Sequence, residues 1–526
     1  MSPGVFTTPG KRVLIWMGLG LGASVLASCV WISQSVRVQS ISPPEGTVVA
    51  NPVKAHLEDG STVVYTDGVT VEGNALRGPG DRYNVTLTDA ERVFLVPLDD
   101  VVAMETYRTD VGTIESVVVT TLATAGTVVA AAAVVFALFG SCPTVYSADG
   151  TVEEAELFSS SIAPLFEARD LDRLTAQPGP DGVLTLEVRN EAMETHYINN
   201  LQLLEVVHRP DEFVLPDSNG RPLVVGPRNG VPVVTDRSGR NVSGDLRAAD
   251  GVAYSTDTGV IDRSTAVDLH DWLDFTVPVP PGAGEIGLVF RLRNSLLGTV
   301  LFYNVMLEPM GAKALDWIGA DLGEISTAVE MGRWLEDRAG LHVSVFRDGE
   351  YREVARVPDS GPISWHDVAV AVPVAPGESS LDVRLSFMAD HWRIDTLEIA
   401  GRVRGAEART IGLARITDGE GNQDAAARDR LLETDAEYLE TRPGQRFFAR
   451  FNAGEARPGQ SRTYLLSSLG YYIEWIRGGW VRDADHSAPR FDPGDDTLLE
   501  ALRRWRDVRE EFEEQFRRER VPVDGV

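Results

Sequence analysis

Apolar and polar residues alternate along much of the chain after residue 54, which is the pattern of half-buried β-strands. Residues 183–188 read Val-Leu-Thr-Leu-Glu-Val, and Gly, Asn and Asp separate such runs at short intervals. Turn residues at this spacing fit short strands joined in antiparallel order. Further strands are expected at 62–65, 69–71, 93–98, 201–207, 275–279, 286–292, 342–346 and 381–387. The pattern predicts a mainly β protein with several units.

The first unit is a small β barrel-like module over residues 54–107. Asp67-Gly68 predicts a two-residue hairpin between the strands at 62–65 and 69–71. The order of short strands, with a final Pro-Leu-Asp-Asp-Val segment at 97–101, resembles small SH3-like barrels. That resemblance implies a fold and no activity, because such barrels carry many functions.

Two larger β units follow, separated by a helical segment. Residues 141–310 predict a β-sandwich-like domain, and residues 311–340 have apolar positions at helical spacing. Residues 341–480 predict a jelly-roll-like β domain, in which Asp348-Gly349 marks a hairpin. The strand order in this last unit resembles jelly-roll modules of the galactose-binding type, which implies carbohydrate or protein binding.

Residues 481–526 predict a linker and an amphipathic C-terminal helix. Six apolar positions recur every three or four residues, and so define one helix face: Leu498, Leu502, Trp505, Val508, Phe512 and Phe516. This face is expected to pack on the body of the protein, with a partner helix as the alternative.

The N-terminal stretch predicts export. Lys11 and Arg12 precede an uncharged apolar run over residues 13–26, as in a secretory signal. The run ends in Leu26-Ala27-Ser28-Cys29, which resembles the lipobox of bacterial lipoproteins. The resemblance implies that residues 1–28 are a signal peptide and that Cys29 becomes the lipidated N-terminus. Residues 29–53 would then be a tether, and an uncleaved anchor is the alternative.

Two features bear on the membrane. The residue after Cys29 is Val30 rather than the Asp of inner-membrane lipoproteins, so the resemblance implies an outer-membrane protein that faces the periplasm. Residues 117–139 carry no charge and are long enough to span a bilayer. The expected helix at 116–140 is either inserted in the membrane or buried against the body, because the acidic residues that follow it contradict an inward crossing.

Composition narrows the partners. The 526 residues carry a net charge of −29, which repels a phosphate backbone and excludes nucleic acid as an expected partner. The chain has two cysteines, Cys29 and Cys142, so no disulfide framework is expected if Cys29 is lipidated.

Ser141-Cys142-Pro143-Thr144-Val145-Tyr146-Ser147 follows the apolar run. This motif resembles a group of uncharacterised bacterial envelope proteins with a Ser-Cys-Pro-x-Val-Tyr-Ser motif. Further matches lie at 190–195, 203–208 and 470–475. The resemblance implies an envelope location and no activity.

Local signatures of catalysis are missing from the sequence. It contains no Gly-x-Ser-x-Gly elbow, no His-Glu-x-x-His pair and no phosphate loop, so a non-catalytic protein without a cofactor is expected. The histidines are scattered, and the nearest grouping is His366, Asp367, His391 and Asp395, which neighbouring strands could bring together.

Two loops offer weaker binding candidates. The acidic run at 418–429 imitates a calcium loop, but a Gln stands where the sharp turn needs Gly, and a solvated loop is favoured. Its oxygen-bearing residues are Asp418, Glu420, Asn422, Asp424 and Asp429. The aromatic stretch at 470–480 offers a ligand platform, unless its alternate members simply divide between core and surface. The platform residues are Tyr471, Tyr472, Glu474, Trp475 and Arg477.

These observations predict a membrane-tethered envelope lipoprotein that acts as a non-catalytic scaffold or binding protein, with a protein or glycan partner. The alternative is a glycan-binding or glycan-processing envelope protein.

Overall fold

The computed structural model describes residues 36–40, 43–50, 53–57, 61–65, 68–83, 90–109, 143–159, 161–162, 164–192, 194–310, 334–442, 444–454, 460–474 and 494–518. Strands make up 51% of the structure and helices 15%, and the sheets are antiparallel. The mainly β prediction is therefore confirmed.

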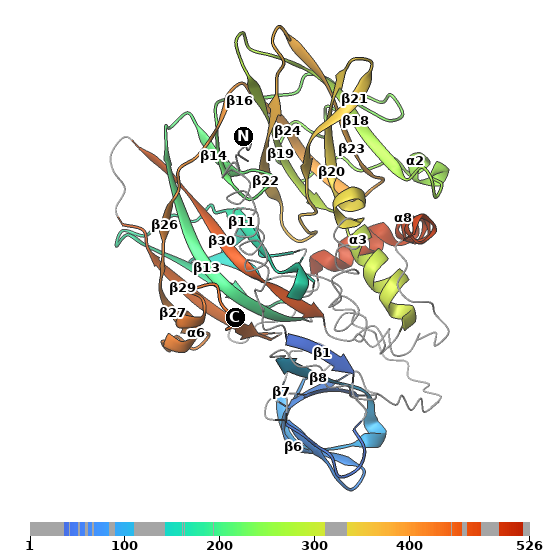
Figure 1. The fold of residues 1–526 in the computed structure, drawn as a ribbon, viewed down its shortest axis with the longest axis vertical. Coiled ribbons are helices and arrows are strands. Elements are labelled where there is room, and N and C mark those ends of the chain that lie inside the picture. Colours follow the sequence, from blue (N-terminus) through green and yellow to red (C-terminus); the bar gives the residue numbers. More distant parts are fainter. Residues whose placement is uncertain are drawn as a thin grey trace, which may run out of the picture.

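Residues 36–109 form one sheet that curls around its own core, drawn in blue in Figure 1. The strand order is β1-β8-β3-β4-β6-β5-β2, and β7 pairs with β6. The elements are β1 (Val36–Ser40), β2 (Val48–Val49), β3 (Val53–Leu57), β4 (Thr62–Tyr65), β5 (Val69–Val71), β6 (Ala75–Tyr83), β7 (Ala90–Pro97), the helical turn η1 (Leu98–Asp100) and β8 (Val101–Thr109).

Two expectations about this module are corrected. The expected tether at 29–53 contains β1 and β2, so the sheet begins at Val36, and β1 pairs along β8 with Val36 opposite Thr109. The predicted hairpin at Asp67-Gly68 is wrong, because β4 and β5 both pair with β6 and not with each other. A neighbouring strand has replaced the local partner.

The first sandwich consists of two sheets around one apolar core. One sheet has the order β10-β9-β12-β29-β27, with β9 (Thr144–Ser147), β10 (Val152–Glu156), β12 (Val183–Arg189), β27 (Leu413–Asp418) and β29 (Arg446–Asn452). The other has the order β11-β30-β13-β26, with β28 beside β13. Its strands are β11 (Ala168–Arg173), β13 (Glu194–His208), β26 (Arg409–Ile411), β28 (Leu439–Thr441) and β30 (Ser461–Glu474). The helical turns η2 (Pro164–Phe166) and α6 (Ala425–Arg430) belong to this part of the chain.

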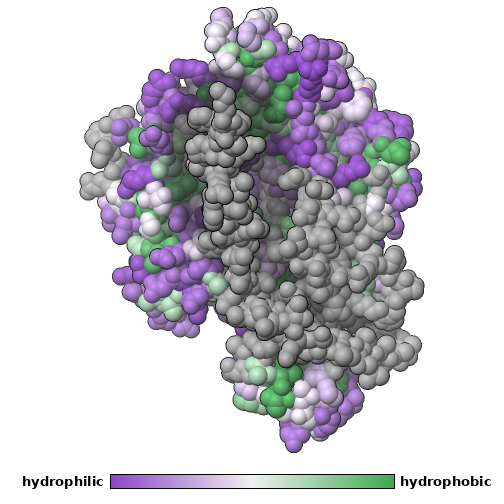
Figure 2. Space-filling model, viewed as in Figure 1, coloured by the Kyte–Doolittle hydropathy of each residue, from purple (hydrophilic) through white to green (hydrophobic). Residues whose placement is uncertain are grey.

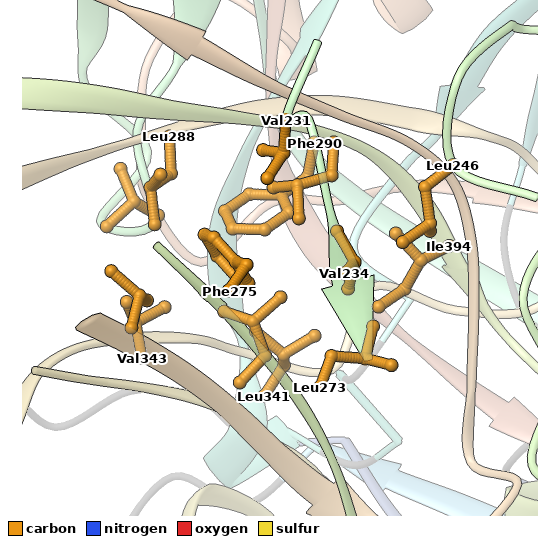
Figure 3. Close-up of a cluster of buried hydrophobic side chains, with 14 of the residues drawn as sticks. Val231, Val234, Leu246, Leu273, Phe275, Leu288, Phe290, Leu341, Val343 and Ile394 are labelled. Atoms are coloured by element: carbon orange, nitrogen blue, oxygen red, sulfur yellow. The ribbon is translucent and has the colours of Figure 1, made fainter. Parts of the chain in front are cut away.

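The second sandwich lies above the first in Figure 1 and has the larger apolar core, which Figure 3 shows in close-up. One sheet has the order β16-β24-β19-β22, with β16 (Arg228–Gly230), β19 (Glu285–Asn294), β22 (His366–Pro373) and β24 (Trp392–Ala400). The other has the order β17-β18-β23-β20-β21, with β17 (Val234–Asp236), β18 (His270–Pro278), β20 (Leu341–Arg347), β21 (Glu350–Val357) and β23 (Ser380–Met388). Alternate residues of β18, such as Leu273, Phe275 and Val277, are buried in this core, as a strand with one solvent face requires.

The second sandwich is inserted into the first. β12 pairs with β29, and β13 pairs with β30 over most of the length of both strands. The three-stranded sheet β14-β15-β25 lies where the chain passes between the sandwiches, with β14 (Phe213–Pro216), β15 (Pro222–Val225) and β25 (Val403–Gly405). The expected division into consecutive domains at 141–310 and 341–480 is therefore corrected, since each sandwich takes strands from both ranges.

Helical segments form a further layer against the second sandwich. They are α2 (Thr258–Arg263), the continuous stretch α3 (Leu297–Thr299), η3 (Val300–Leu307) and η4 (Glu308–Met310), then η6 (Leu335–Ala339) and α8 (Asp495–Arg518). Leu498, Leu502 and Trp505 of α8 are almost fully buried against α3 and η3. The prediction that the tail helix packs on the body is confirmed. Of the expected helical segment at 311–340, residues 311–333 lie outside the described residues.

Candidate functional site

A cavity of about 260 Å³ lies where the two sandwiches meet. The first sandwich contributes β10 and β11, and the second contributes β22 and the loop before it. The turn between β14 and β15 closes one side.

His366, the first residue of β22, lies between two carboxylates of the first sandwich. Its Nδ1 is 3.4 Å from Oδ1 of Asp172, and its Nε2 is 3.7 Å from Oε2 of Glu156. Asp172 and Glu156 are almost completely buried. Burial alone lowers the pKa of His366, but the hydrogen bonds and negative charges of Asp172 and Glu156 together outweigh it and raise that pKa well above its ordinary value. A protonated imidazole therefore bridges the sandwiches.

Glu156 also holds the loop that precedes β22. Its Oε2 accepts hydrogen bonds from the backbone N–H groups of Ile363 and Ser364, each at 2.9 Å. Gly361 passes so close that a Cβ there would overlap the Glu156 carboxylate, and its φ of +85° is a conformation that favours glycine. The loop thus covers a buried charge and satisfies it with backbone donors.

Arg291 of β19 is the second link between the sandwiches. Its Nη1 donates to Oε2 of Glu154 at 2.6 Å and is 3.3 Å from Oδ1 of Asp367. Its Nε is 3.3 Å from Oδ2 of Asp395. The hydrogen bond that Arg291 donates to Glu154 is the largest of several effects that raise the pKa of Arg291 further, so this guanidinium stays charged.

Strand register explains how Asp395 reaches Arg291. Arg291 is opposite Asp367 on one side and Thr396 on the other, while the next residue, Leu292, is opposite Ile394. Asp395 is therefore the extra residue of a β-bulge, and a bulge re-aims the side chain it carries. Burial raises the pKa of Asp395, and the nearby Arg291 charge opposes that rise.

Asp170 is the residue of this site best suited to proton transfer. Burial, followed by the charge of Asp172, raises the pKa of Asp170 to about 7. Its oxygens accept from the backbone N–H groups of Phe158 and Leu171 at 3.1 and 2.8 Å. Asp170 and Asp172 alternate with Leu171 on β11 and so share a strand face. A carboxyl that titrates near neutrality beside a second carboxylate can exchange a proton with a bound molecule.

The sequence grouped His366, Asp367, His391 and Asp395, and the structure divides this group. Asp367 and Asp395 do meet, through Arg291. His366 contacts Asp172 and Glu156 instead, and Nε2 of His391 is 2.9 Å from Oδ1 of Asp359. The two histidines therefore have separate partners.

The aromatic stretch does not form an open platform over its described residues. Tyr471 is 1% exposed and stacks on Tyr197 with ring centroids 4.8 Å apart. Tyr472 and Glu474 are also buried, but they line a second, smaller cavity, and Tyr303 donates a hydrogen bond to Glu474. The expected division of alternate members between core and surface is wrong for the described residues, because all three of these side chains are buried. Trp475 and Arg477 lie outside the described residues.

The oxygen atoms of the weak calcium candidate serve the loop itself. Asp418 accepts from the backbone N–H groups of Glu420 and Asn422, Asp424 caps α6 through Ala427 N, and Asp429 pairs with Arg428. Across the part of the chain that the structure describes, no group of three or more His, Cys, Asp or Glu residues is placed to hold a metal ion.

Several expectations fall on residues outside the described ranges. They include the signal peptide with Cys29, the apolar helix at 116–140 and Cys142. Among the helices that are described, none combines the length and apolar character needed to cross a bilayer.

Comparisons with known proteins carry little information for this chain. No family model matches it, and no curated protein matches it. Among solved structures, the chain was aligned with the structure of the infectious bursal disease virus Gx strain, at 9% identity over 92% of each chain. The TM-score of that alignment is 0.09, so it supports no argument about fold or function.

Sequence reasoning missed Glu156, Asp170, Asp172 and Arg291. They occur in ordinary alternating strands, and no local motif marks them. One signal was present: Asp170 and Asp172 put two carboxylates on one face of a strand, which is unusual for a face that packs against another domain.

Proposed function

We propose that this protein is an exported envelope lipoprotein, anchored by lipidated Cys29, whose body acts as a non-catalytic scaffold or binding protein. The observation that carries the proposal is the lipobox Leu26-Ala27-Ser28-Cys29 after an uncharged apolar run, with the first described strand beginning at Val36. Val30 after the cysteine favours the outer membrane, with the body in the periplasm.

The length of the tether supports a membrane-proximal barrel. Only residues 30–35 separate Cys29 from β1. That stretch spans at most ~25 Å when fully extended. A lipid on Cys29 would therefore hold the N-terminal sheet against the membrane surface, where a flexible arm as long as 29–53 would not.

The register of the N-terminal sheet supports the same orientation. Val36 and Thr109 are opposite each other in the β1–β8 pair, so the chain enters and leaves this sheet at one end. The uncharged run at 117–139 begins shortly after Thr109. The sheet also exposes Phe94 and Leu95 of β7, and Figure 2 shows apolar residues gathered on it, whereas the outer surfaces of the sandwiches are largely polar.

The sandwich junction supports a scaffold role for the body. A protonated His366 and Arg291, each bound to carboxylates of the first sandwich, fix the two sandwiches relative to each other. A rigid pair of sandwiches presents a constant surface to a protein or glycan partner, and rigid surfaces bind with less ordering entropy.

Metabolic labelling with a palmitate analogue tests the anchor. Wild-type protein should be labelled and should fractionate with membranes, whereas Cys29→Ser should lose the label and accumulate with its signal uncleaved. Cys142→Ser is the matched control, because it removes the only other thiol and should leave labelling intact. Persistent labelling of Cys29→Ser would overturn the lipoprotein assignment.

One observation favours the second candidate, a glycan-processing protein. Asp170, with a pKa of about 7, and Asp172 line a cavity that also contains the indole of Trp365. A protonated acid beside a carboxylate, with an aromatic ring for stacking, is the chemistry of glycoside cleavage. Purified peptidoglycan and chitin oligosaccharides are suitable probes. Release of reducing ends that Asp170→Asn abolishes would favour this candidate over the scaffold.

A further inference from the structure

A second cavity, of about 100 Å³, lies between the helical layer and the ends of the two sandwiches. Its walls are mainly apolar and aromatic. They come from α3, η3, β23 and β30, and from Trp334, which directly precedes η6. The apolar lining residues include Leu301, Phe302, Leu307, Trp334, Met388 and Tyr472. A mostly apolar cavity with a few polar groups is the usual form of a small-molecule site.

Asn294 supplies the first polar group without a partner. It is 2% exposed, and its Oδ1 accepts hydrogen bonds from the backbone N–H groups of Ser360 and Gly361, both at 2.7 Å. These two donors fix the orientation of the amide, because a flipped amide would place its NH2 group against the two backbone N–H groups. Its Nδ2 is left buried without a hydrogen bond. Both N–H bonds of this amide are thus available to a ligand.

Trp334 and His391 supply two more buried polar atoms without a hydrogen-bond partner. Nε1 of Trp334 is buried and makes no hydrogen bond, while its ring packs edge-on against Phe302 with centroids 5.6 Å apart. His391 is 3% exposed and uses Nε2 for Asp359, so that Nδ1 is buried and unpaired. A buried polar atom without a partner costs about 1 to 3 kcal/mol. Three such atoms on residues that line one cavity indicate that a bound molecule supplies the missing hydrogen-bond partners.

We propose that this cavity binds a compact, neutral, mainly apolar molecule that carries one oxygen acceptor, such as a ketone, an amide or an alcohol. Nδ2 of Asn294 and Nε1 of Trp334 can only donate, so they require an acceptor and cannot serve an ammonium group. The two carboxylates on the wall, Asp359 and Glu474, disfavour an anion.

The volume sets the size of this molecule. The cavity is somewhat smaller than an engineered cavity of about 150 Å³ that takes benzene. A ring of five or so carbon atoms with one oxygen fits that limit. Such a ligand would contact both sandwiches and the helical layer. Asp170 lines the other cavity, so this binding does not depend on Asp170 or on the lipid anchor.

Saturation-transfer NMR on the purified full-length protein tests the proposal, with cyclopentanone as the probe. Cyclopentane, cyclopentylamine and cyclopentanecarboxylate are the matched comparison compounds, because they change only the polar group. Cyclopentanone should bind more tightly than all three. Trp334→Phe keeps the ring and removes the donor, so it should weaken cyclopentanone binding by roughly fivefold, as one lost hydrogen bond does, and leave cyclopentane unaffected.

A variant that fills the cavity tests the location. Gly298 of α3 lines the cavity, and a Cβ on it would meet only Cε1 of His391, at an ordinary 3.6 Å. Gly298→Leu should abolish cyclopentanone binding while the melting temperature stays at or above the wild-type value, and Gly298→Ala should retain most of the binding. The proposal is overturned if cyclopentanone gives no signal, if the amine or the carboxylate binds better, or if folded Gly298→Leu binds as wild type does.

Discussion

Nε1 of Trp505 donates a hydrogen bond of 2.7 Å to Oδ2 of Asp390, which lies 115 residues earlier in the chain. Both side chains are fully buried. The same carboxylate accepts from Arg393 at 2.8 Å and from Thr256 N at 3.1 Å, and Arg509 of α8 is 3.3 Å away. α8 is therefore joined to the second sandwich by directed polar bonds as well as by its apolar face.

Trp505→Ala should lower the stability of the protein markedly. The substitution leaves a cavity in the core under α8, and loss of a buried aromatic side chain typically costs about 3 to 5 kcal/mol. Trp505→Phe keeps most of the packing and loses the bond to Asp390, so it should cost about 1 to 2 kcal/mol. The urea midpoint, followed by circular dichroism, measures both effects.

Arg503→Ala is the control for this series, because Arg503 lies on the exposed side of the same helix. Its effect should stay within about 0.5 kcal/mol. A Trp505→Ala midpoint equal to that of Arg503→Ala would show that α8 does not contribute to the core in solution.

Asp170 should make the stability of the protein fall as the pH rises from about 4 to 7. Its pKa is raised to about 7 in the folded state, whereas an ordinary Asp ionises near 3.8, so the folded state holds the extra proton across this window. A state that binds more protons loses stability as pH rises. Asp170→Asn should flatten the curve of unfolding free energy against pH by roughly 2 to 4 kcal/mol over this interval.

His366 should also make the stability of the protein fall as the pH rises. Because its folded pKa is raised, its stabilising effect is complete below about pH 6.5 and is lost as pH rises through the higher folded value. Asp172 and Glu156 are in contact with it, and Asp170 interacts with its charge. For the Asp170→Asn variant, Asp181→Asn in an exposed turn is the control for the loss of one negative charge. A pH profile of Asp170→Asn identical to wild type would refute the assigned protonation of Asp170.

Gly361→Ala should destabilise the sandwich junction more than a comparable change elsewhere. Gly377 has nearly the same backbone conformation, with φ of +91° against +85° for Gly361, but no atom lies within 4 Å of a Cβ placed on it. Gly377→Ala therefore isolates the cost of the positive φ, about 1 to 2 kcal/mol. Gly361→Ala has the same cost and also displaces Glu156, so its thermal midpoint should be clearly lower than that of Gly377→Ala. Equal midpoints for the two variants would contradict the tight contact with Glu156.

Features that depend on neighbouring residues were predictable from the sequence. Alternation gave the strands, and Asp348-Gly349 joins β20 to β21 as a hairpin, with positive φ at both positions, because no other strand competes for that partner. Periodicity likewise gave α8 and its buried face, since a helix closes its own hydrogen bonds.

The same reasoning failed where the partner came from elsewhere. Asp67-Gly68 is the same dipeptide, yet β6 pairs with both flanking strands and replaces the hairpin. The insertion of one sandwich into the other depends on the pairing of β13 with β30, which are separated by the whole second sandwich. A strand exposes the same backbone donors and acceptors to any partner, so its sequence does not select one.

Local sequence patterns are sufficient to predict the class of the elements, the apolar face of the tail helix and the basis of the export hypothesis. Only the tertiary structure brought His366 to Asp172 and Glu156, and Asn294, Trp334 and His391 to one cavity. These groups are distant in sequence and lie in strands or helices whose local patterns are ordinary. Their pKa values and unsatisfied hydrogen bonds arise from burial and from long-range neighbours, and neither is encoded within a short window of the chain.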